Sequence, residues 1–258
     1  MCFLPRESLV RVVRIFQDED VRYGLADDTT ITLISDEPFA AWETEGIVPL
    51  SQAQLLSPVI PTKIVCVGIN YRDHAREMGH QIPKEPVLFL KPPTAINGPH
   101  GDIRIPESMN SVDYEGELAV VIGRRTHKVT PEAARAHVLG YLCANDVTAR
   151  DLQKIDGQWT RAKGFDSFCP VGPWVETDID PLDLKIETYL NGEQRQSART
   201  SDMVFNPFEL VSFVSGVMTL LPGDLVLTGT PSGIGPMRRG DVVEVRIEGV
   251  GSLINQVV

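Results

Sequence analysis

Acidic residues stand at alternate positions in the segment DYEGEL, where Asp113, Glu115 and Glu117 precede the apolar run AVVI. Side chains alternate between the two faces of a strand, so these three carboxylates would share one face. Like charges repel each other, and buried carboxylates need partners, of which a divalent cation is the strongest. The spacing therefore indicates either a metal site or, as the ordinary alternative, a solvated strand end.

Two neighbouring features favour the metal site. Gly116 removes the side chain from the opposite face, which lets another element approach closely. Ala119 and Val121 continue the face of the acids and are apolar, so this face is expected to point to the interior. Asp113 stands at the start of the strand, where we expect it nearer the surface and the least suited of the three to bind a metal.

A further acid, Asp146, ends another apolar strand in LGYLCANDV. If that strand lies beside the first, Glu115, Glu117 and Asp146 form an all-oxygen site. Such a site selects Mg²⁺, Mn²⁺ or Ca²⁺ over zinc, and three protein ligands leave positions for substrate and water.

Other candidate residues lie in short charged clusters. His74 and Glu77 are three residues apart on an expected helix, so they share a face and could act as a general base and its orienting partner. The alternative is an incidental pair on a surface helix. Lys91 ends the apolar segment LFLK, and Lys163 lies in RAKGFDSF. Either lysine could complement an anionic ligand or be merely solvated.

Two more segments could contact a substrate. Arg150 and Gln153 follow Asp146 and offer a guanidinium fork and an amide. The glycine-rich segment TGTPSGIGP could bind a carboxylate through backbone N–H groups and the Thr230 hydroxyl. It lacks the lysine and the following helix of a nucleotide-binding loop. The remaining histidines, His80 among them, show no partner spacing and are expected to be structural or surface residues.

The elements that must position these groups are mostly strands. Helices are expected after Asp73, after Thr130 and after Asn206, each in the N-cap position, and a hairpin is expected to turn at Asn191-Gly192. Strands and helices do not alternate regularly, which disfavours a doubly wound sheet. The expected class is α+β and strand-dominated, a mixed β-roll. Residues 1–60 read as a small N-terminal β domain, and residues 61–258 as the catalytic domain.

Composition excludes several classes of function. The net charge of −11 disfavours nucleic acid and anionic membranes as partners, and no apolar run is long enough to span a bilayer. The first residues lack the pattern of a signal peptide, so a cytoplasmic protein is expected. The four cysteines form no CxxC pair and are expected to be buried free thiols: Cys2, Cys66, Cys143 and Cys169.

Six motifs in order resemble the fumarylacetoacetate hydrolase family over about residues 62 to 258. They read VGINYRDHAREMG, FLKPPTAINGP, DYEGELAVVIG, NDVTARDLQ, AKGFDSFCPVGP and PGDLVLTGTPSGIGP. The resemblance implies a β-roll, a Mg²⁺ or Mn²⁺ cofactor and a homodimer. It assigns the metal to Glu115, Glu117 and Asp146, catalysis to His74, Glu77 and Lys163, and substrate binding to Arg150, Gln153, Thr230 and, more weakly, Lys91.

One departure narrows the implied substrate. Fumarylacetoacetate hydrolase itself has a fourth carboxylate ligand a few residues before its catalytic histidine, where this sequence has Val67 and Gly68. A three-carboxylate member acting on a smaller 2-oxo acid fits better. The substrate would chelate the metal through its carboxylate and keto oxygens, and the metal would act as a Lewis acid.

The expected activity is therefore C–C bond cleavage of a small 2-oxo acid, as in an oxaloacetate decarboxylase or an acylpyruvate hydrolase. The His–Glu pair favours this reading. An isomerase or tautomerase of 2-oxo or 2-hydroxy-diene dicarboxylates is the alternative, because it would use the same metal site. A protein that binds a 2-oxo acid without turnover is a more remote one.

Overall fold

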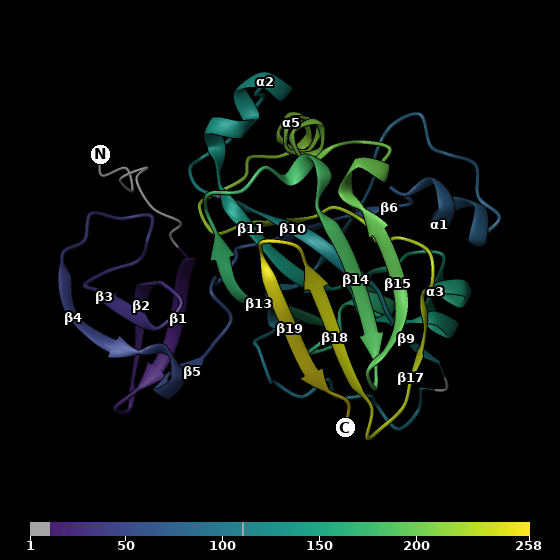
Figure 1. The fold of residues 1–258 in the computed structure, drawn as a ribbon. Helices are drawn as coiled ribbons and strands as arrows, with labels where there is room; N and C mark the ends of the chain where they lie inside the picture. The colour runs from purple at the N-terminus through teal and green to yellow at the C-terminus, as the bar shows by residue number, and fades with distance from the viewer. Residues whose placement is uncertain (1–10, 110) are drawn as a thin grey trace.

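The computed structural model describes residues 11–109 and 111–258, and strands dominate it. The prediction of a strand-dominated α+β fold is confirmed (Figure 1). The largest sheet has the order β4-β3-β2-β1-β13-β11-β10-β16-β6-β7, with β5 paired to β1 and β8 paired to β13. Along this order its strands are β4 (Thr44–Pro49), β3 (Thr30–Ile34), β2 (Asp20–Ala26), β1 (Arg11–Gln17), β13 (Cys169–Glu176), β11 (Val138–Asn145), β10 (Gly116–Ile122), β16 (Leu225–Leu227), β6 (Ile64–Gly68) and β7 (Val87–Lys91), with β5 (Gln54–Leu55) and β8 (Ile96–Asn97).

Two smaller sheets and five α-helices complete the described chain. The three-stranded sheet contains β12 (Thr148–Ala149), β9 (Val112–Tyr114) and β17 (Gly235–Met237). The four-stranded sheet contains β15 (Glu193–Arg199), β14 (Lys185–Leu190), β18 (Val242–Ile247) and β19 (Gly251–Gln256). The helices are α1 (Arg72–Glu77), α2 (Pro131–Ala134), α3 (Arg150–Asp156), α4 (Thr160–Lys163) and α5 (Pro207–Val217).

Strand β10 is buried on both faces, which explains its unbroken apolar sequence after Glu117. Leu118 and Val120 pack into a cluster that contains residues of α5 and of the four-stranded sheet. Ala119 and Val121 pack into a second cluster on the opposite face, among residues of β6, β13 and β16. Figure 1 shows the four-stranded sheet in front of the large one, with α5 above it. Glu117 thus lies at the second position of a strand from which solvent is excluded on both sides.

Local sequence signals predicted most element boundaries. The side chains of Thr130 and Asn206 cap α2 and α5, as expected, and Asn191-Gly192 connects β14 to β15. The prediction that Asp73 caps α1 is wrong, because the extended residue before that helix is Tyr71. Asp73 lies in the first turn instead, where its carboxylate complements the positive end of the helix dipole.

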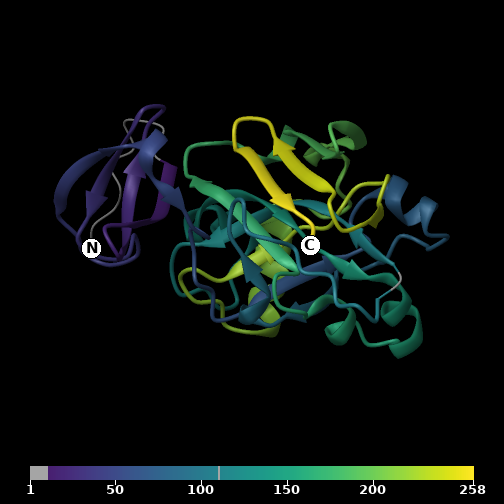
Figure 2. The ribbon, with the colours of Figure 1, turned by 90° about the horizontal axis from the view of Figure 1, so that it is seen from below.

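The N-terminal strands form a meander that stands to one side of the main body (Figures 1 and 2). It has a small apolar cluster of its own around Val13, Ile15 and Ile31. Strand β1 joins the main sheet through two residues of β13, and Arg11 lies on the Trp174 ring at 4.7 Å. The domain boundary expected at residue 60 stays a prediction.

Candidate active site

The antiparallel pairing of β10 with β11 brings the three predicted ligands together. Gly116 lies opposite Asn145, and the Asp146 N–H donates to the Glu115 carbonyl at 2.8 Å. Carboxylate oxygens of Glu115, Glu117 and Asp146 lie within 4.8 Å of one another, and all three residues are buried. An all-oxygen donor set of this size fits Mg²⁺ or Mn²⁺. The residues present could therefore hold the divalent cation that the resemblance implies.

The two glutamates of this group differ in their surroundings. Burial raises the pKa of Glu115, but Lys163 and Arg150 outweigh it and lower that pKa to about 2. Burial and the nearby Asp146 and Glu115 carboxylates raise the pKa of Glu117 well above its ordinary value. The backbone N–H of Gly229 donates to Glu117 at 2.6 Å and only partly offsets this. The carboxylate of Glu117 is the one that most needs a cation.

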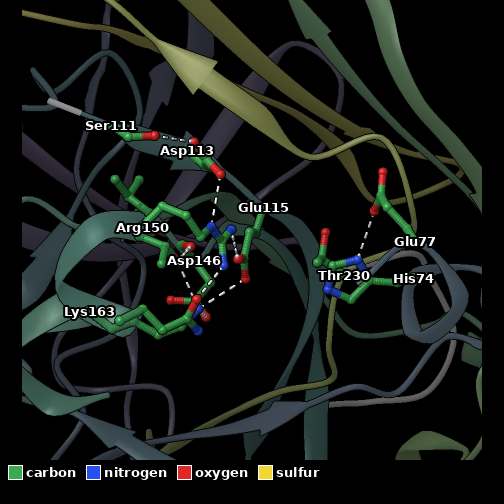
Figure 3. A network of polar contacts seen from close by, with 12 residues as sticks. His74, Glu77, Ser111, Asp113, Glu115, Asp146, Arg150, Lys163 and Thr230 are labelled. Carbon is green, nitrogen blue, oxygen red and sulfur yellow. Dashed lines mark hydrogen bonds and ion pairs between the residues drawn. The ribbon is translucent and has the colours of Figure 1, made fainter. Parts of the chain in front are cut away.

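Both lysines are buried and point into the carboxylate group, as Figure 3 shows for Lys163. The Lys163 ammonium donates to Glu115 at 3.0 Å, to Asp146 at 2.5 Å and to the Thr148 hydroxyl at 2.8 Å. Lys91 donates to the other oxygen of Asp146 at 2.5 Å and to the carbonyl of Val147. The alternative of solvated lysines is excluded, since both ammonium groups neutralise the acids.

Arg150 links Asp113 to the site. Its Nε donates to Asp113 at 2.9 Å, its Nη2 to Glu115 at 2.5 Å and its Nη1 to the Gln153 side-chain oxygen at 2.6 Å (Figure 3). The expectation of a surface position for Asp113 is wrong: it is 6% exposed. Residues 113 to 117 do not form one strand, because Glu115 lies between β9 and β10, which belong to different sheets. Asp113 therefore faces Arg150 and is not part of the carboxylate group.

Thr230 lies at the floor of the pocket, held by the backbone of β10. Its hydroxyl donates to the Gly116 carbonyl at 2.9 Å and accepts from the Gln196 amide at 2.8 Å. The oxygen of Gln196 in turn accepts from the Gly116 N–H. Gln196 comes from β15, and no signal in its polar, exposed-looking hairpin sequence could have predicted this contact. The close approach expected at Gly116 is confirmed, since a Cβ there would lie 2.1 Å from Thr188.

His74 and Glu77 form the expected pair on α1. The His74 Nδ1 lies 3.0 Å from Glu77, and the ring faces the same pocket as the three acids (Figure 3). The other oxygen of Glu77 accepts the backbone N–H of Gly233 at 3.0 Å. The alternative of an incidental surface pair is excluded, because His74 is 7% exposed and its partner is fixed from a second element.

A cavity of about 380 Å³, within the range of small-molecule sites, is lined by many of these groups. They are His74, Glu115, Glu117, Asp146, Arg150, Gln153, Lys163 and Thr230. Several further lining residues were not predicted from the sequence as site residues, among them Met78, His80, Phe89, Lys154 and Trp159. The Trp159 ring packs on Phe89 at 5.1 Å and covers Gly68, where a Cβ would lie 2.7 Å from the indole. Any side chain at position 68, one of the two positions where the fourth carboxylate would fall, would collide with Trp159.

The comparisons with known proteins show the family of the chain. Residues 63–258 match the model of the fumarylacetoacetate hydrolase C-terminal family, and residues 10–58 match an N-terminal family described as Rv2993c-like. The chain belongs to the fumarylacetoacetate hydrolase family, and the predicted family is confirmed. It is accordingly a member of an enzyme family with a strand-dominated fold.

Relatives with high identity include both unnamed and named proteins. Protein Rv2993c of Mycobacterium tuberculosis is 50% identical over 94% of this chain and 93% of its own length. The bovine mitochondrial oxaloacetate tautomerase FAHD2A is 46% identical over 82% of this chain and 72% of its own. A crystal structure of 2-hydroxyhepta-2,4-diene-1,7-dioate isomerase from Mycobacterium marinum is 47% identical, with a TM-score of 0.90 over 96% of this chain and 98% of that one.

Three of the four cysteines fall within the described residues, and Cys66, Cys143 and Cys169 are buried free thiols as expected. Cys2 lies outside those residues. Across residues 11–109 and 111–258, no helix has the length and apolar character needed to cross a membrane.

Proposed function

We propose that this protein is a divalent-metal-dependent enzyme that moves a proton on small 2-oxo dicarboxylates, with the keto–enol tautomerisation of oxaloacetate as its first candidate reaction. The observation that carries the proposal is the single pocket in which the Glu115, Glu117 and Asp146 carboxylates lie together with the His74–Glu77 pair. The names of the tautomerase and isomerase relatives support the same class of reaction.

The charges of the site suit a dianionic substrate. The floor holds four buried carboxylates, counting Asp113, against the cations Lys91, Lys163 and Arg150, which leaves one net negative charge. A bound dication would turn this into one net positive charge. When bound there, Mg²⁺ or Mn²⁺ would supply Lewis-acid polarisation of the 2-oxo group.

His74 is the residue placed to move the proton. With Nδ1–H donated to Glu77, the neutral ring keeps its Nε2 lone pair free to accept a proton. In the proposed reaction, Nε2 takes the proton from C3 of the keto form and delivers it to the 2-oxygen, so no proton is lost. Gly233 fixes Glu77 and thereby the tautomer of His74.

Cleavage of a C–C bond is the second candidate, and the same pair favours it. A base beside the pocket could activate water against the distal carbonyl of an acylpyruvate, while decarboxylation of oxaloacetate would need only a proton donor. Tautomerisation is the first candidate because the named relatives at 46–47% identity are a tautomerase and an isomerase.

A two-signal assay with oxaloacetate separates the candidates. We would follow enol absorbance and pyruvate release together, with Mg²⁺, with EDTA and in the Glu115→Ala variant. Faster equilibration of the enol signal without pyruvate supports the tautomerase. Pyruvate release above the metal-only background that is lost in both controls supports the decarboxylase. If the protein produces neither signal, both candidate reactions are contradicted. His74→Asn should reduce either activity by about 100- to 10,000-fold.

The remaining expectations belong to this proposal. A cytoplasmic location, a homodimer, and the division into residues 1–60 and 61–258 stay predictions. The non-catalytic binder stays the most remote alternative, and turnover in the assay would exclude it.

A further inference from the structure

The cations at the floor of the pocket are already engaged. Each of the three N–H groups of Lys163 has a partner, namely Glu115, Asp146 and Thr148. All three nitrogens of Arg150 donate to protein oxygens as well. Lys163 cannot donate to the far end of a substrate without giving up one of these contacts, and Arg150 has three of its five N–H groups committed to protein oxygens at the buried floor.

Lys154 differs from these cations. It lines the same pocket but is exposed, and among the described residues its ammonium has no hydrogen-bond or ion-pair partner. It lies four residues after Arg150 on α3, so the two side chains share a helix face about 6 Å apart along the axis. Arg150 points to the buried floor, and Lys154 therefore lies one turn nearer the mouth.

The wall beside Lys154 suits a carbon chain. Trp159 and Phe89 pack edge to face at 5.1 Å, and Met78, at the end of α1, also lines the cavity. A ligand held at the floor by its 2-oxo acid group would pass these apolar side chains. Its second carboxylate would then meet the uncommitted cation at the mouth.

We propose that Lys154 binds the distal carboxylate of the substrate and so selects 2-oxo dicarboxylates over 2-oxo monocarboxylates. This inference rests on the proposed function, because it takes the 2-oxo acid end to lie at the metal site. Lysine is a point charge on a flexible stem, so it can follow dicarboxylates of different length. The selected property is the second negative charge rather than a fixed chain length.

The test compares oxaloacetate with its 4-methyl ester, which lacks the distal charge. In Lys154→Gln, KM for oxaloacetate should rise about 10- to 150-fold, the loss expected for one hydrogen bond to a charged group. The kcat should stay within about twofold, and the kinetics on the ester should not change. Lys154→Arg should retain most of the selectivity. Lys84→Gln removes another exposed lysine outside the pocket and serves as the matched control.

Equal losses on both substrates, or none on either, would overturn the role of Lys154. If the wild-type protein turns over neither compound, the proposed function fails and binding decides the inference. Calorimetric titration of the Mg²⁺-loaded protein would then compare oxaloacetate with pyruvate, which lacks only the second carboxylate. The inference is supported if Lys154→Gln weakens the binding of oxaloacetate and leaves the binding of pyruvate unchanged. It is rejected if the variant binds oxaloacetate as tightly as the wild type does, or if the wild type does not bind it.

Discussion

The pocket floor and the N-terminal β unit are both built on strands, yet they handle charge in opposite ways. In the N-terminal unit, charged side chains pair at the surface, as Arg22 does with Glu45 and Arg11 with Asp28. At the floor, four carboxylates and three cations are buried, and Figure 3 shows Arg150 and Lys163 bonded to Asp113, Glu115 and Asp146. Exposed pairs contribute little to stability, whereas buried charges are costly unless every one is matched.

The two regions differ in the charge that their interiors contain, and an unbalanced buried charge lowers stability. The floor contains one more negative than positive charge, and Glu117 has one backbone N–H as its hydrogen-bond partner among the described residues. Between residues 11 and 60 the buried cluster of the N-terminal unit is apolar and contains no such imbalance of charge. We expect variants at the floor to change function strongly, and variants in the N-terminal unit to change stability alone.

The largest effect is expected for Glu117→Gln. Loss of a ligand should reduce Mg²⁺ affinity and metal-dependent activity by more than about 100-fold, beyond the range for outer-shell residues. The metal-free variant should melt at the same or a higher temperature, because a charge that is repelled by Asp146 and Glu115 has been removed. Thermal melts with and without Mg²⁺ measure both effects. Glu85→Gln, in an exposed loop, is the control, and a retained Mg²⁺ shift in Glu117→Gln would contradict the metal site.

A series of thermal melts at different pH values in EDTA tests the charge of Glu117 further. The pKa of Glu117 is raised in the folded protein, so its contribution to stability is full below its unfolded pKa and declines as pH rises toward the folded one. The melting temperature of the metal-free protein should therefore fall as the pH rises above about 4.5, the ordinary pKa of a glutamate, and Mg²⁺ should restore it. The difference between wild type and Glu117→Gln isolates this group. A difference that does not vary with pH would contradict the assignment.

A smaller effect is expected for Asp113→Asn. Asp113 orients Arg150, which holds Glu115, so kcat/KM should fall about 10- to 100-fold, as for other residues that support a metal ligand. Mg²⁺ affinity should fall with it. Ser111 contacts Asp113 at 3.4 Å, and Ser111→Ala should have a weaker effect. Full activity in Asp113→Asn would show that Arg150 is positioned by Glu115 and Gln153 alone.

The smallest effect is expected in the N-terminal unit. Asp27 accepts hydrogen bonds from Thr29 and Thr30, first from their backbone N–H groups, and these lower its pKa to about 2. A lowered pKa means that the stabilisation is full above about pH 4 and disappears as pH falls toward 2. Asp27→Ala should thus lower the melting temperature slightly at pH 7 and not at pH 2, with unchanged turnover. Lost turnover would show that the two regions are coupled.

Much of the floor could be predicted from sequence because it follows strand periodicity. The alternation of Glu117, Ala119 and Val121 places all three on one face, and the glycine at 116 indicates a close neighbour. The error at Asp113 has the same origin. Periodicity treats residues 113 to 117 as one strand, but the chain passes from one sheet to another at Glu115.

By itself, the sequence determined the elements and the types of donor: the strand pattern, the caps at Thr130 and Asn206, and oxygen ligands suited to a hard cation. These depend on residues near each other in the chain. Only the tertiary structure decided which cations bind the carboxylates, that Gln196 holds Thr230, and that the Lys154 ammonium has no hydrogen-bond or ion-pair partner among the described residues. Such contacts depend on sheet order and packing between segments far apart in sequence, which local propensity does not encode.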